Sequence, residues 1–282
     1  MTDHEPGAAS EPSEGGEETT APSSETRLRT APLEVVGRFA DASNATLLVR
    51  LLDRDARSLE DLAERLGRTP EVDELDPVDL AVYKPRRGEA PLWDFPTGTL
   101  HRREVAAYEL SVALGWDLVP ETVLREDAPF DVGSLQRFVR HDPQRHYFTL
   151  LETGDGQVRG QLLDMVVFDL VIDNADRKAG HVLLDAAATG TRIRLVDHGV
   201  AFNVERKLRT VAWDLAGETI PGERLADVDR VREALDGELG TRLGRLLDDA
   251  EVWALRRRVE AVLALAVLPE PSGPYPYPWP LL

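Results

Sequence analysis

Cysteine is absent from the 282 residues of this sequence. Its absence excludes a disulfide scaffold and thiolate chemistry, and it fits a reducing compartment. No apolar run approaches the roughly 20 residues that a membrane-spanning helix needs. The opening stretch, MTDHEPGAASEPSEGGEETT, also lacks the basic and apolar regions of a signal peptide. These absences predict a cytoplasmic protein without a transmembrane segment.

Basic residues are scarce relative to acidic ones. The chain has 33 Lys and Arg against 51 Asp and Glu, which gives a net charge of −18 at pH 7. Such a protein is repelled on average by nucleic acid and by anionic membrane surfaces. We therefore expect neither as the main partner. The hydrophobic content of 42% and charged content of 30% are typical of a soluble globular chain.

The distribution of apolar residues divides the chain into five regions. Residues 1–31 are rich in Glu, Ser, Pro, Gly and Thr without apolar periodicity, which predicts a disordered acidic tail. We expect an N-lobe over 32–133, a hinge at 134–140 and a C-lobe over 141–268. In the tail at 269–282, PEPSGPYPYPWPLL, proline alternates with aromatic residues. This composition favours polyproline II structure or a strap on the surface.

Periodicity predicts the secondary structure of the two lobes. The N-lobe has β-branched and aliphatic runs that predict five strands, and its clearest helix lies over 98–115. In the C-lobe, an all-round apolar stretch at 161–173 predicts a buried helix, and further helices are expected within 225–268. The fold class is therefore α+β with two lobes, an N-terminal sheet and a mainly helical C-lobe. A cleft between two lobes is a natural ligand site.

The stretch from Asp173 to Phe202 contains the most suggestive chemistry. Two carboxylates, Asp176 and Asp197, are expected at the ends of two short strands, with His181 and a turn-rich link between them. A hairpin that brings two carboxylates and a histidine together could hold a metal ion or move a proton. The same pattern also describes a surface hairpin whose polar residues are solvated.

Phosphoryl transfer requires a turn over the phosphates, a cation, metal ligands and a group that orients the nucleophile. One candidate for each occurs in order along the chain: a turn at Ser43 and Asn44, Lys84 held by Glu104, Asp176 for the acceptor hydroxyl, and Asp197 for Mg²⁺. Taken singly, each residue also has an ordinary structural role at a strand end, on a helix surface or in a turn.

Five motifs in this order resemble the phosphatidylinositol 3-/4-kinase superfamily, and in particular its small kinase-related members from actinobacteria. They are VYKP at 82–85, REVAAYELSVALGW at 103–116, GSLQRFV at 133–139, NADRKAGHVLL at 174–184 and LVDHG at 195–199. The resemblance covers residues 33–221. It implies a bilobed protein-kinase-like fold and the use of ATP with Mg²⁺ or Mn²⁺.

The resemblance also implies roles for individual residues. Lys84 and Glu104 correspond to the nucleotide lysine and its helix partner, Asp176 to the catalytic aspartate, and Asp197 to the metal ligand. Three residues of the implied hinge would bind the adenine: Gln136, Phe138 and Val139.

Two residues depart from the family pattern. His181 occupies a position where most relatives have a metal-binding Asn, and imidazole is a poorer ligand for Mg²⁺ than an amide oxygen. His181 could bind Mn²⁺, contact phosphate directly, or mark weak or lost transfer. His198 replaces the Phe of the Asp-Phe-Gly segment, where it could instead form hydrogen bonds in the core.

The acceptor is left open between a lipid head group, a protein hydroxyl and a soluble small molecule. A basic cluster, Arg206, Lys207 and Arg209, would suit an anionic group, although it also describes a solvated turn. Two other functions remain: a pseudokinase or other nucleotide-transfer enzyme with altered metal use, and a non-catalytic module that binds partners.

Overall fold

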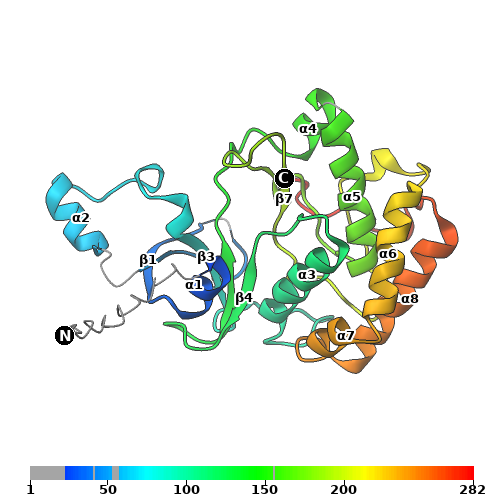
Figure 1. Ribbon diagram of the computed structural model, residues 1–282, viewed down its shortest axis with the longest axis horizontal. Helices are drawn as coiled ribbons and strands as arrows, with labels where there is room; N and C mark the ends of the chain where they lie inside the picture. The colour runs from blue at the N-terminus through cyan, green and yellow to red at the C-terminus, as the bar shows by residue number, and fades with distance from the viewer. Residues whose placement is uncertain (1–22, 41, 53–56, 155) are drawn as a thin grey trace, which may run out of the picture.

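The computed structural model describes residues 23–40, 42–52, 57–154 and 156–282. Two lobes lie side by side, a sheet-rich lobe from the first half of the chain and a larger helical lobe from the second (Figure 1). Each lobe has its own hydrophobic core. The predicted α+β, two-lobed architecture is confirmed.

A five-stranded antiparallel sheet forms the centre of the N-lobe. Its strands lie in the order β1 (Leu33–Arg38), β2 (Leu47–Leu51), β3 (Leu80–Pro85), β5 (Gly133–Arg137) and β4 (Thr122–Arg125). Side chains alternate between the two faces of a strand. Tyr83 of β3 therefore packs into the small core, while the neighbouring Lys84 points to the opposite face.

Helix α1 (Ser24–Thr30) covers one face of this sheet, in a region that we predicted to be part of a disordered tail. Leu28 is fully buried in the core beneath the sheet. The guanidinium of Arg125 donates hydrogen bonds to the carbonyls of Leu28 and Ala31, each at 2.9 Å. The prediction was wrong here because Leu28 and Ala31 pack into the core of the sheet, which composition cannot reveal. Residues 1–22 lie outside the described residues.

Helix α2 (Leu59–Leu66) begins after the capping residue Ser58 and ends at Gly67, which has a φ of 67°. The main helix of the N-lobe, α3 (Leu100–Leu114), ends in the same way at Gly115, with a φ of 74°. Glycine adopts this left-handed conformation without a steric penalty, which explains both ends.

The C-lobe consists mainly of helices, and the longest two pack against each other. These helices are α4 (Tyr147–Thr153), α5 (Gly156–Ile172), α6 (Gly222–Ala234), α7 (Glu238–Leu243) and α8 (Asp249–Leu265). We did not predict α4, which occupies a segment that reads as a charged link. The predicted hairpin exists as β6 (Val182–Leu184) paired with β7 (Ile193–Leu195). Asp176 precedes β6 by a whole loop, so it does not lie at a strand end as predicted.

The connection between the lobes starts later than predicted. Residues 134–137, which we assigned to the hinge, belong to β5 and pair with both β3 and β4. The extended link begins at Phe138, whose N–H still donates to the carbonyl of Leu80 at 3.1 Å. Among the described residues, no helix is long and apolar enough to cross a membrane.

Candidate active site

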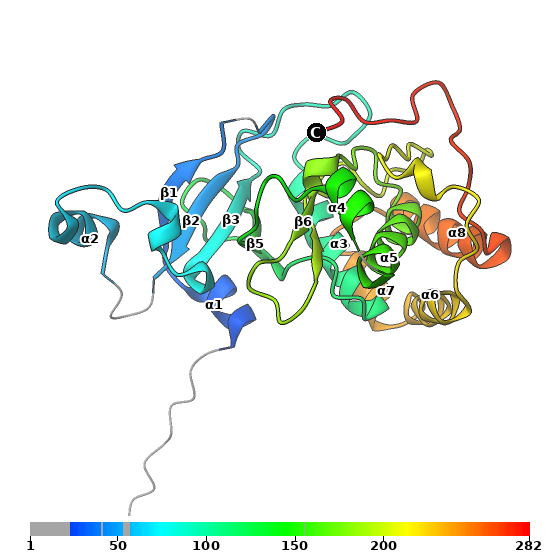
Figure 2. The same cartoon turned by 90° about the horizontal axis from the view of Figure 1, so that it is seen from above.

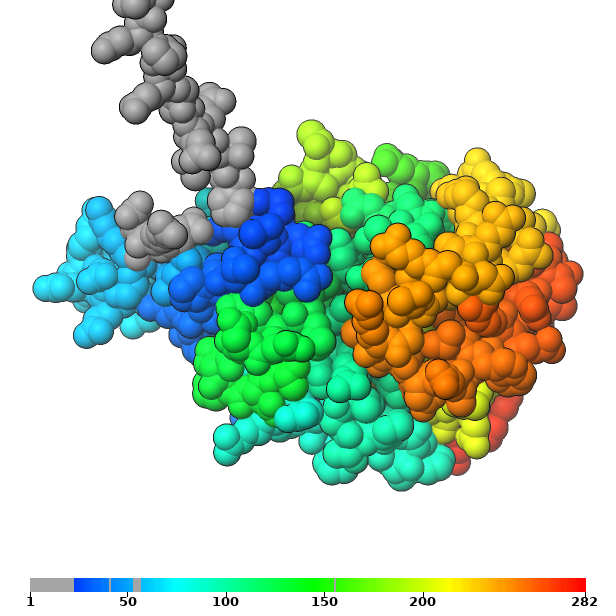
Figure 3. Space-filling view, turned by 60° about the horizontal axis from the view of Figure 1, so that its bottom comes forward, coloured from blue at the N-terminus to red at the C-terminus, as the bar shows by residue number. Residues whose placement is uncertain are grey.

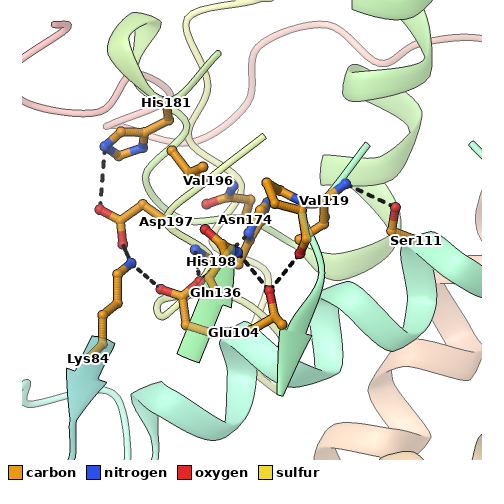
Figure 4. Close-up of polar contacts among 12 residues, drawn as sticks. Lys84, Glu104, Ser111, Val119, Gln136, Asn174, His181, Val196, Asp197 and His198 are labelled. Atoms are coloured by element: carbon orange, nitrogen blue, oxygen red, sulfur yellow. Dashed lines mark hydrogen bonds and ion pairs between the residues drawn. The ribbon is translucent and has the colours of Figure 1, made fainter. Parts of the chain in front are cut away.

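Lys84, Glu104 and Asp197 meet at the junction of the two lobes (Figure 4). The Lys84 ammonium forms a hydrogen-bonded ion pair with Oε1 of Glu104 and lies 3.0 Å from Oδ1 of Asp197. These residues come from β3, from α3 and from the loop after β7. Burial alone would lower the pKa of Lys84, but the charges of Asp197 and Glu104 outweigh it and raise that pKa above its usual value. Lys84 therefore remains a cation.

Contacts at both sides of Glu104 fix its position on α3. At the start of the helix, the carboxylate of Glu89 accepts hydrogen bonds from the N–H groups of Gly98 at 2.6 Å and Leu100 at 3.1 Å. An acidic side chain at this position satisfies free N–H groups and favours the helix dipole. Beside Glu104, Arg103 is almost fully buried and pairs with Glu251 of α8. The helix is thus held from the loop before it and from the C-lobe.

The histidine that follows Asp197 is a buried hydrogen-bonding residue. His198 is fully buried, and its backbone N–H donates to Oε2 of Glu104 at 3.1 Å. Its Nε2 lies 2.9 Å from Nη2 of Arg177. Because a guanidinium can only donate, His198 accepts at Nε2 and is neutral. Burial, followed by the charge of Arg177, lowers the pKa of His198 well below its usual value.

Arg177 belongs to the candidate catalytic loop and is also completely buried. Its guanidinium forms two hydrogen bonds to the carboxylate of Asp169 on α5, at 2.9 and 3.0 Å. A further bond reaches the carbonyl of Val196 at 2.9 Å. This arginine therefore connects α5, the loop that contains Asp176 and the segment that contains Asp197.

Asp176 lies at the start of this loop and its backbone is fixed by Asn174, whose side-chain oxygen accepts the Asp176 N–H at 3.0 Å. The Asp176 carboxylate is 2.8 Å from the ammonium of Lys178. Burial raises the pKa of Asp176, and the hydrogen bond from Lys178 opposes that shift. A partly buried carboxylate in this setting is able to orient a hydroxyl or accept its proton.

Asp197 and His181 form the candidate metal site. Oδ2 of Asp197 lies 3.4 Å from Nε2 of His181, and half of the Asp197 side-chain surface remains accessible. Asp197 has a φ of 62°, a conformation that is costly for a residue other than glycine and often occurs at functional sites. The charge of Lys84 strongly lowers the pKa of Asp197. Burial lowers the pKa of His181 to about 4, so at neutral pH its ring has a lone pair available for a ligand.

These two donors fit a divalent cation only in part. No group of three or more His, Cys, Asp or Glu in the described parts of the chain is placed to hold a metal ion. Two protein ligands are too few for a stable site, but metal ions at phosphoryl-transfer sites usually take the remaining ligands from the nucleotide and from water. The donor set of one carboxylate and one neutral imidazole suits Mn²⁺ better than Mg²⁺.

Three other residues expected to bind the nucleotide are Ser43, Asn44 and Gln136, and the hydrogen bonds of Asn44 and Gln136 hold the N-lobe together. Asn44 uses its side-chain oxygen to accept the N–H of Ala90 at 2.7 Å, which fixes the turn between β1 and β2, and Ser43 is exposed in that turn. The side chain of Gln136 is buried and donates to Thr122 at 2.8 Å. This bond makes Gln136 a structural residue of the sheet.

The link after β5 offers main-chain groups for an adenine. Val139 is buried, and its carbonyl lies 2.9 Å from Nδ1 of His141. Among the described residues, neither the carbonyl of Phe138 nor the N–H of Arg140 has a hydrogen-bond partner. An acceptor and a donor two residues apart point to the same side of an extended chain. The base edge of adenine presents the matching pair.

Sequence reasoning missed Asp169, Asn174, Arg177 and Lys178 as parts of this site. The signal for Lys178 was present, because a cation two residues after a catalytic aspartate can reach the same phosphate. Asp169 gave no such signal, since it lies within an apolar helix where its partner is visible only in three dimensions. In the predicted basic cluster, the Lys207 ammonium already has partners within the chain. It lies 2.9 Å from the Asp94 carboxylate and 4.6 Å from the centre of the Trp93 ring.

The chain has a protein-kinase-like fold. The structure of hydra Fam20 with sugar superposes with a TM-score of 0.54 and 15% sequence identity, and the match covers 85% of this chain and 86% of that one. The crystal structure of the Golgi casein kinase with Mn/ADP bound gives a TM-score of 0.47 at 14% identity, over 84% of this chain and 73% of that one.

At the level of sequence, no family model matches the chain. Protein Rv2133c of Mycobacterium tuberculosis is 38% identical over 286 residues, an alignment that covers 90% of this chain and 93% of that protein. The chain belongs to the same family as protein Rv2133c.

Proposed function

We propose that this protein is an ATP-dependent phosphotransferase that moves the γ-phosphate of ATP to a hydroxyl group. The observation that carries the proposal is the contact of Lys84 with both Glu104 and Asp197. A lysine held by a helix glutamate beside an aspartate at the lobe junction is the arrangement that phosphoryl transfer in kinases requires. Its three residues come from segments far apart in the sequence.

The proposed roles follow from charge and position. Lys84 binds phosphate oxygens of ATP, and Glu104 keeps its ammonium in place. Asp176 orients the acceptor hydroxyl and takes up its proton as the bond to phosphorus forms. Lys178, which contacts Asp176 in the structure, is placed to balance negative charge on the transferred group. The turn at Ser43 covers the phosphates, and the Phe138 to Arg140 link binds the adenine.

Asp197 and His181 would hold the divalent cation together with oxygens of the nucleotide. The bound cation would neutralise charge on the phosphates. Before ATP binds, Lys84 occupies one oxygen of Asp197. The incoming phosphates offer Lys84 a new anionic partner and free this oxygen for the metal. Metal binding is therefore expected to depend on nucleotide.

The resemblance to phosphatidylinositol 3-/4-kinases supports a lipid head group as one acceptor class, with a protein hydroxyl as the other. A second function, a nucleotide-binding pseudokinase, is favoured by His181 alone. The net charge of −18 disfavours an anionic bilayer as the site of action.

Transfer of radiolabelled γ-phosphate tests the proposal. The purified chain is incubated with labelled ATP and Mg²⁺ or Mn²⁺, together with lipid vesicles or a protein mixture, and Asp176→Asn is compared with the unaltered chain. We expect at least a 100-fold loss of transfer in Asp176→Asn. The matched control is Asp229→Asn, at an exposed pair with Arg232 on α6.

Equal transfer by the unaltered chain and Asp176→Asn would refute the role of Asp176. If the chain binds nucleotide but transfers no phosphate, the pseudokinase is favoured. If it neither binds nucleotide nor transfers phosphate, the non-catalytic binding module is favoured. ATP-dependent thermal stabilisation measures the binding separately.

A further inference from the structure

The C-terminal segment, residues 269–282, returns from the end of α8 to the junction of the lobes. In Figure 2 it runs along the edge of the C-lobe towards the N-lobe. The space-filling view shows that the start of this path lies at the outer surface of the C-lobe (Figure 3). The segment has no helix or strand of its own. Its position is set by contacts to the rest of the chain.

Within the described parts of the chain, three hydrogen bonds hold the segment, and main-chain carbonyls accept all three. The carbonyl of Pro276 accepts from the indole N–H of Trp213 at 2.8 Å and from the N–H of Thr210 at 3.2 Å. The carbonyl of Leu281 accepts from the N–H of Ala179 at 2.8 Å. Between these two points the side chain of Pro278 is buried.

The neighbouring side chains of the segment are not used for attachment. Tyr277 is 50% exposed and Trp279 is 87% exposed. Proline has no N–H group, so the carbonyls of a proline-rich chain have few partners within the chain and can accept hydrogen bonds from another surface. Recognition of such a chain through an indole N–H and a slot for one proline is a known mode of peptide binding. The C-terminal segment is thus bound as a peptide ligand would be.

The surface that binds it is continuous with the candidate catalytic loop. Ala179 follows Asp176 by three residues, and Thr210 forms a β-bridge with Arg177. We call this surface, formed by Ala179, Thr210 and Trp213, the strap surface. An acceptor must approach the Asp176 carboxylate, so a chain on the strap surface lies beside its path.

We infer that the strap surface is the binding site for the acceptor, that the acceptor is a proline-containing protein segment, and that residues 275–281 occupy the site as a built-in competitor. This inference rests on the proposed function and names its substrate class. A protein acceptor is favoured over a lipid because the donors of the strap surface bind two main-chain carbonyls, those of Pro276 and Leu281, on either side of the buried Pro278. A lipid head group has no main-chain carbonyls and no proline ring.

Binding of the segment in trans tests the inference. The probe is a fluorescein-labelled peptide of residues 273–282, GPYPYPWPLL, and its binding to the full-length chain is followed by fluorescence anisotropy without nucleotide. Two release variants weaken the internal strap: Pro278→Asp places a charge in the slot, and Pro278→Gly removes the ring without adding charge. We expect the release variants to bind the probe at least ~10-fold more tightly than the unaltered chain, because the tethered segment competes at high effective concentration.

A further variant tests the hydrogen bond that the Trp213 indole donates to the Pro276 carbonyl. Adding Trp213→Phe to Pro278→Gly removes the indole N–H and retains an aromatic ring, and we expect ~5-fold weaker binding of the probe. Trp253→Phe, at an exposed tryptophan on α8, is the matched control and should not change binding. A peptide with alanine at each proline should bind more weakly, since it lacks the pre-ordered conformation.

Equal binding of the probe by the unaltered chain and both release variants, with unchanged thermal unfolding, would overturn the inference. So would unchanged binding after Trp213→Phe. With labelled ATP, the release variants should label the tyrosines of the unlabelled peptide at least ~3-fold faster than the unaltered chain does. Transfer to phosphatidylinositol vesicles and not to the peptide would overturn the acceptor class while the proposed function stood. Peptide binding with no transfer to any acceptor would instead refute the proposed function.

Discussion

Lys84 lies 3.0 Å from Asp197 while it is bonded to Glu104, so one ammonium joins two carboxylates that come from different lobes. Two negative charges around one positive charge leave this centre with a net negative charge. A triphosphate can enter only if a cation accompanies it or if Lys84 exchanges one carboxylate for phosphate. The contact between Lys84 and Asp197 is therefore expected to be exchanged when nucleotide binds.

Glu104→Gln should weaken nucleotide binding. The neutral amide holds the ammonium less firmly, and Lys84 is then drawn towards Asp197 and away from the phosphates. We expect the affinity for ADP with Mn²⁺ to fall about 10-fold, as measured by isothermal titration calorimetry. Glu109→Gln is the control on the same helix, where Glu109 pairs with Arg242. An unchanged affinity in Glu104→Gln would contradict the proposed role of the ion pair.

His181→Asn should shift the metal preference towards Mg²⁺. An amide oxygen is a harder ligand than an imidazole nitrogen, and the neutral ring of His181 lies within 3.4 Å of Asp197. The measurement is the ratio of nucleotide affinities in Mg²⁺ and Mn²⁺, which we expect to change by at least 5-fold, on the order of one ligand interaction. His146→Asn, at the start of α4, should leave the ratio as it is. The same ratio in His181→Asn would exclude His181 as a metal ligand.

Asp169→Ala should destabilise the whole fold. Its carboxylate is the buried partner of Arg177, and without it a fully buried guanidinium loses its counter-charge. Breaking one side of such a pair costs about 3–5 kcal/mol. Urea unfolding should show this loss in the free energy of unfolding, with Asp229→Ala on the surface of α6 as the control. A loss below about 1 kcal/mol would mean that Arg177 finds another partner or water.

His101 should make the stability depend on pH. Its ring is buried on α3, neither ring nitrogen has a hydrogen-bond partner among the described residues, and burial lowers its pKa to about 4 from 6.5. Between pH 6.5 and pH 4 the imidazole of His101 is therefore protonated in the unfolded chain and neutral in the folded chain. The stability that the neutral ring provides is complete above pH 6.5 and is lost as the pH falls towards 4. At pH 5 the loss is about 2 kcal/mol.

The comparison of His101→Leu with the unaltered chain isolates this effect. The unfolding free energy of each protein is measured at pH 7 and at pH 5, and the drop should be about 2 kcal/mol smaller in the variant. Equal drops in the two proteins would show that His101 is protonated in the folded state.

The elements with strong local signals could be predicted from the sequence. Helix α3 and the strands of the sheet were found because turn residues and apolar periodicity determine them locally. The candidate site was found as far as its motifs reach, and Lys84, Glu104, Asp197 and His181 do come together. The catalytic, nucleotide and metal roles of these residues stay predictions.

What could not be predicted depends on contacts between distant segments. Leu28 turns a polar stretch into a helix only because the sheet offers a place for it, and Asp169 is paired only because Arg177 arrives from the loop that follows. The C-terminal segment could be predicted as a strap from its prolines, but its attachment to Ala179 could not, since a carbonyl carries no sequence signal.

Helix α3 belongs to the sheet lobe by its position in the sequence and to the helical lobe by its packing. Its apolar residues Ala106, Ala107, Leu110 and Leu114 lie in the large core, and Arg103 is paired with α8. If the sheet rocks, Lys84 moves and Glu104 stays. The distance between these two side chains therefore changes as the lobes open and close. Because α3 packs with the C-lobe, its amide exchange should be as slow as that of α5 and α8.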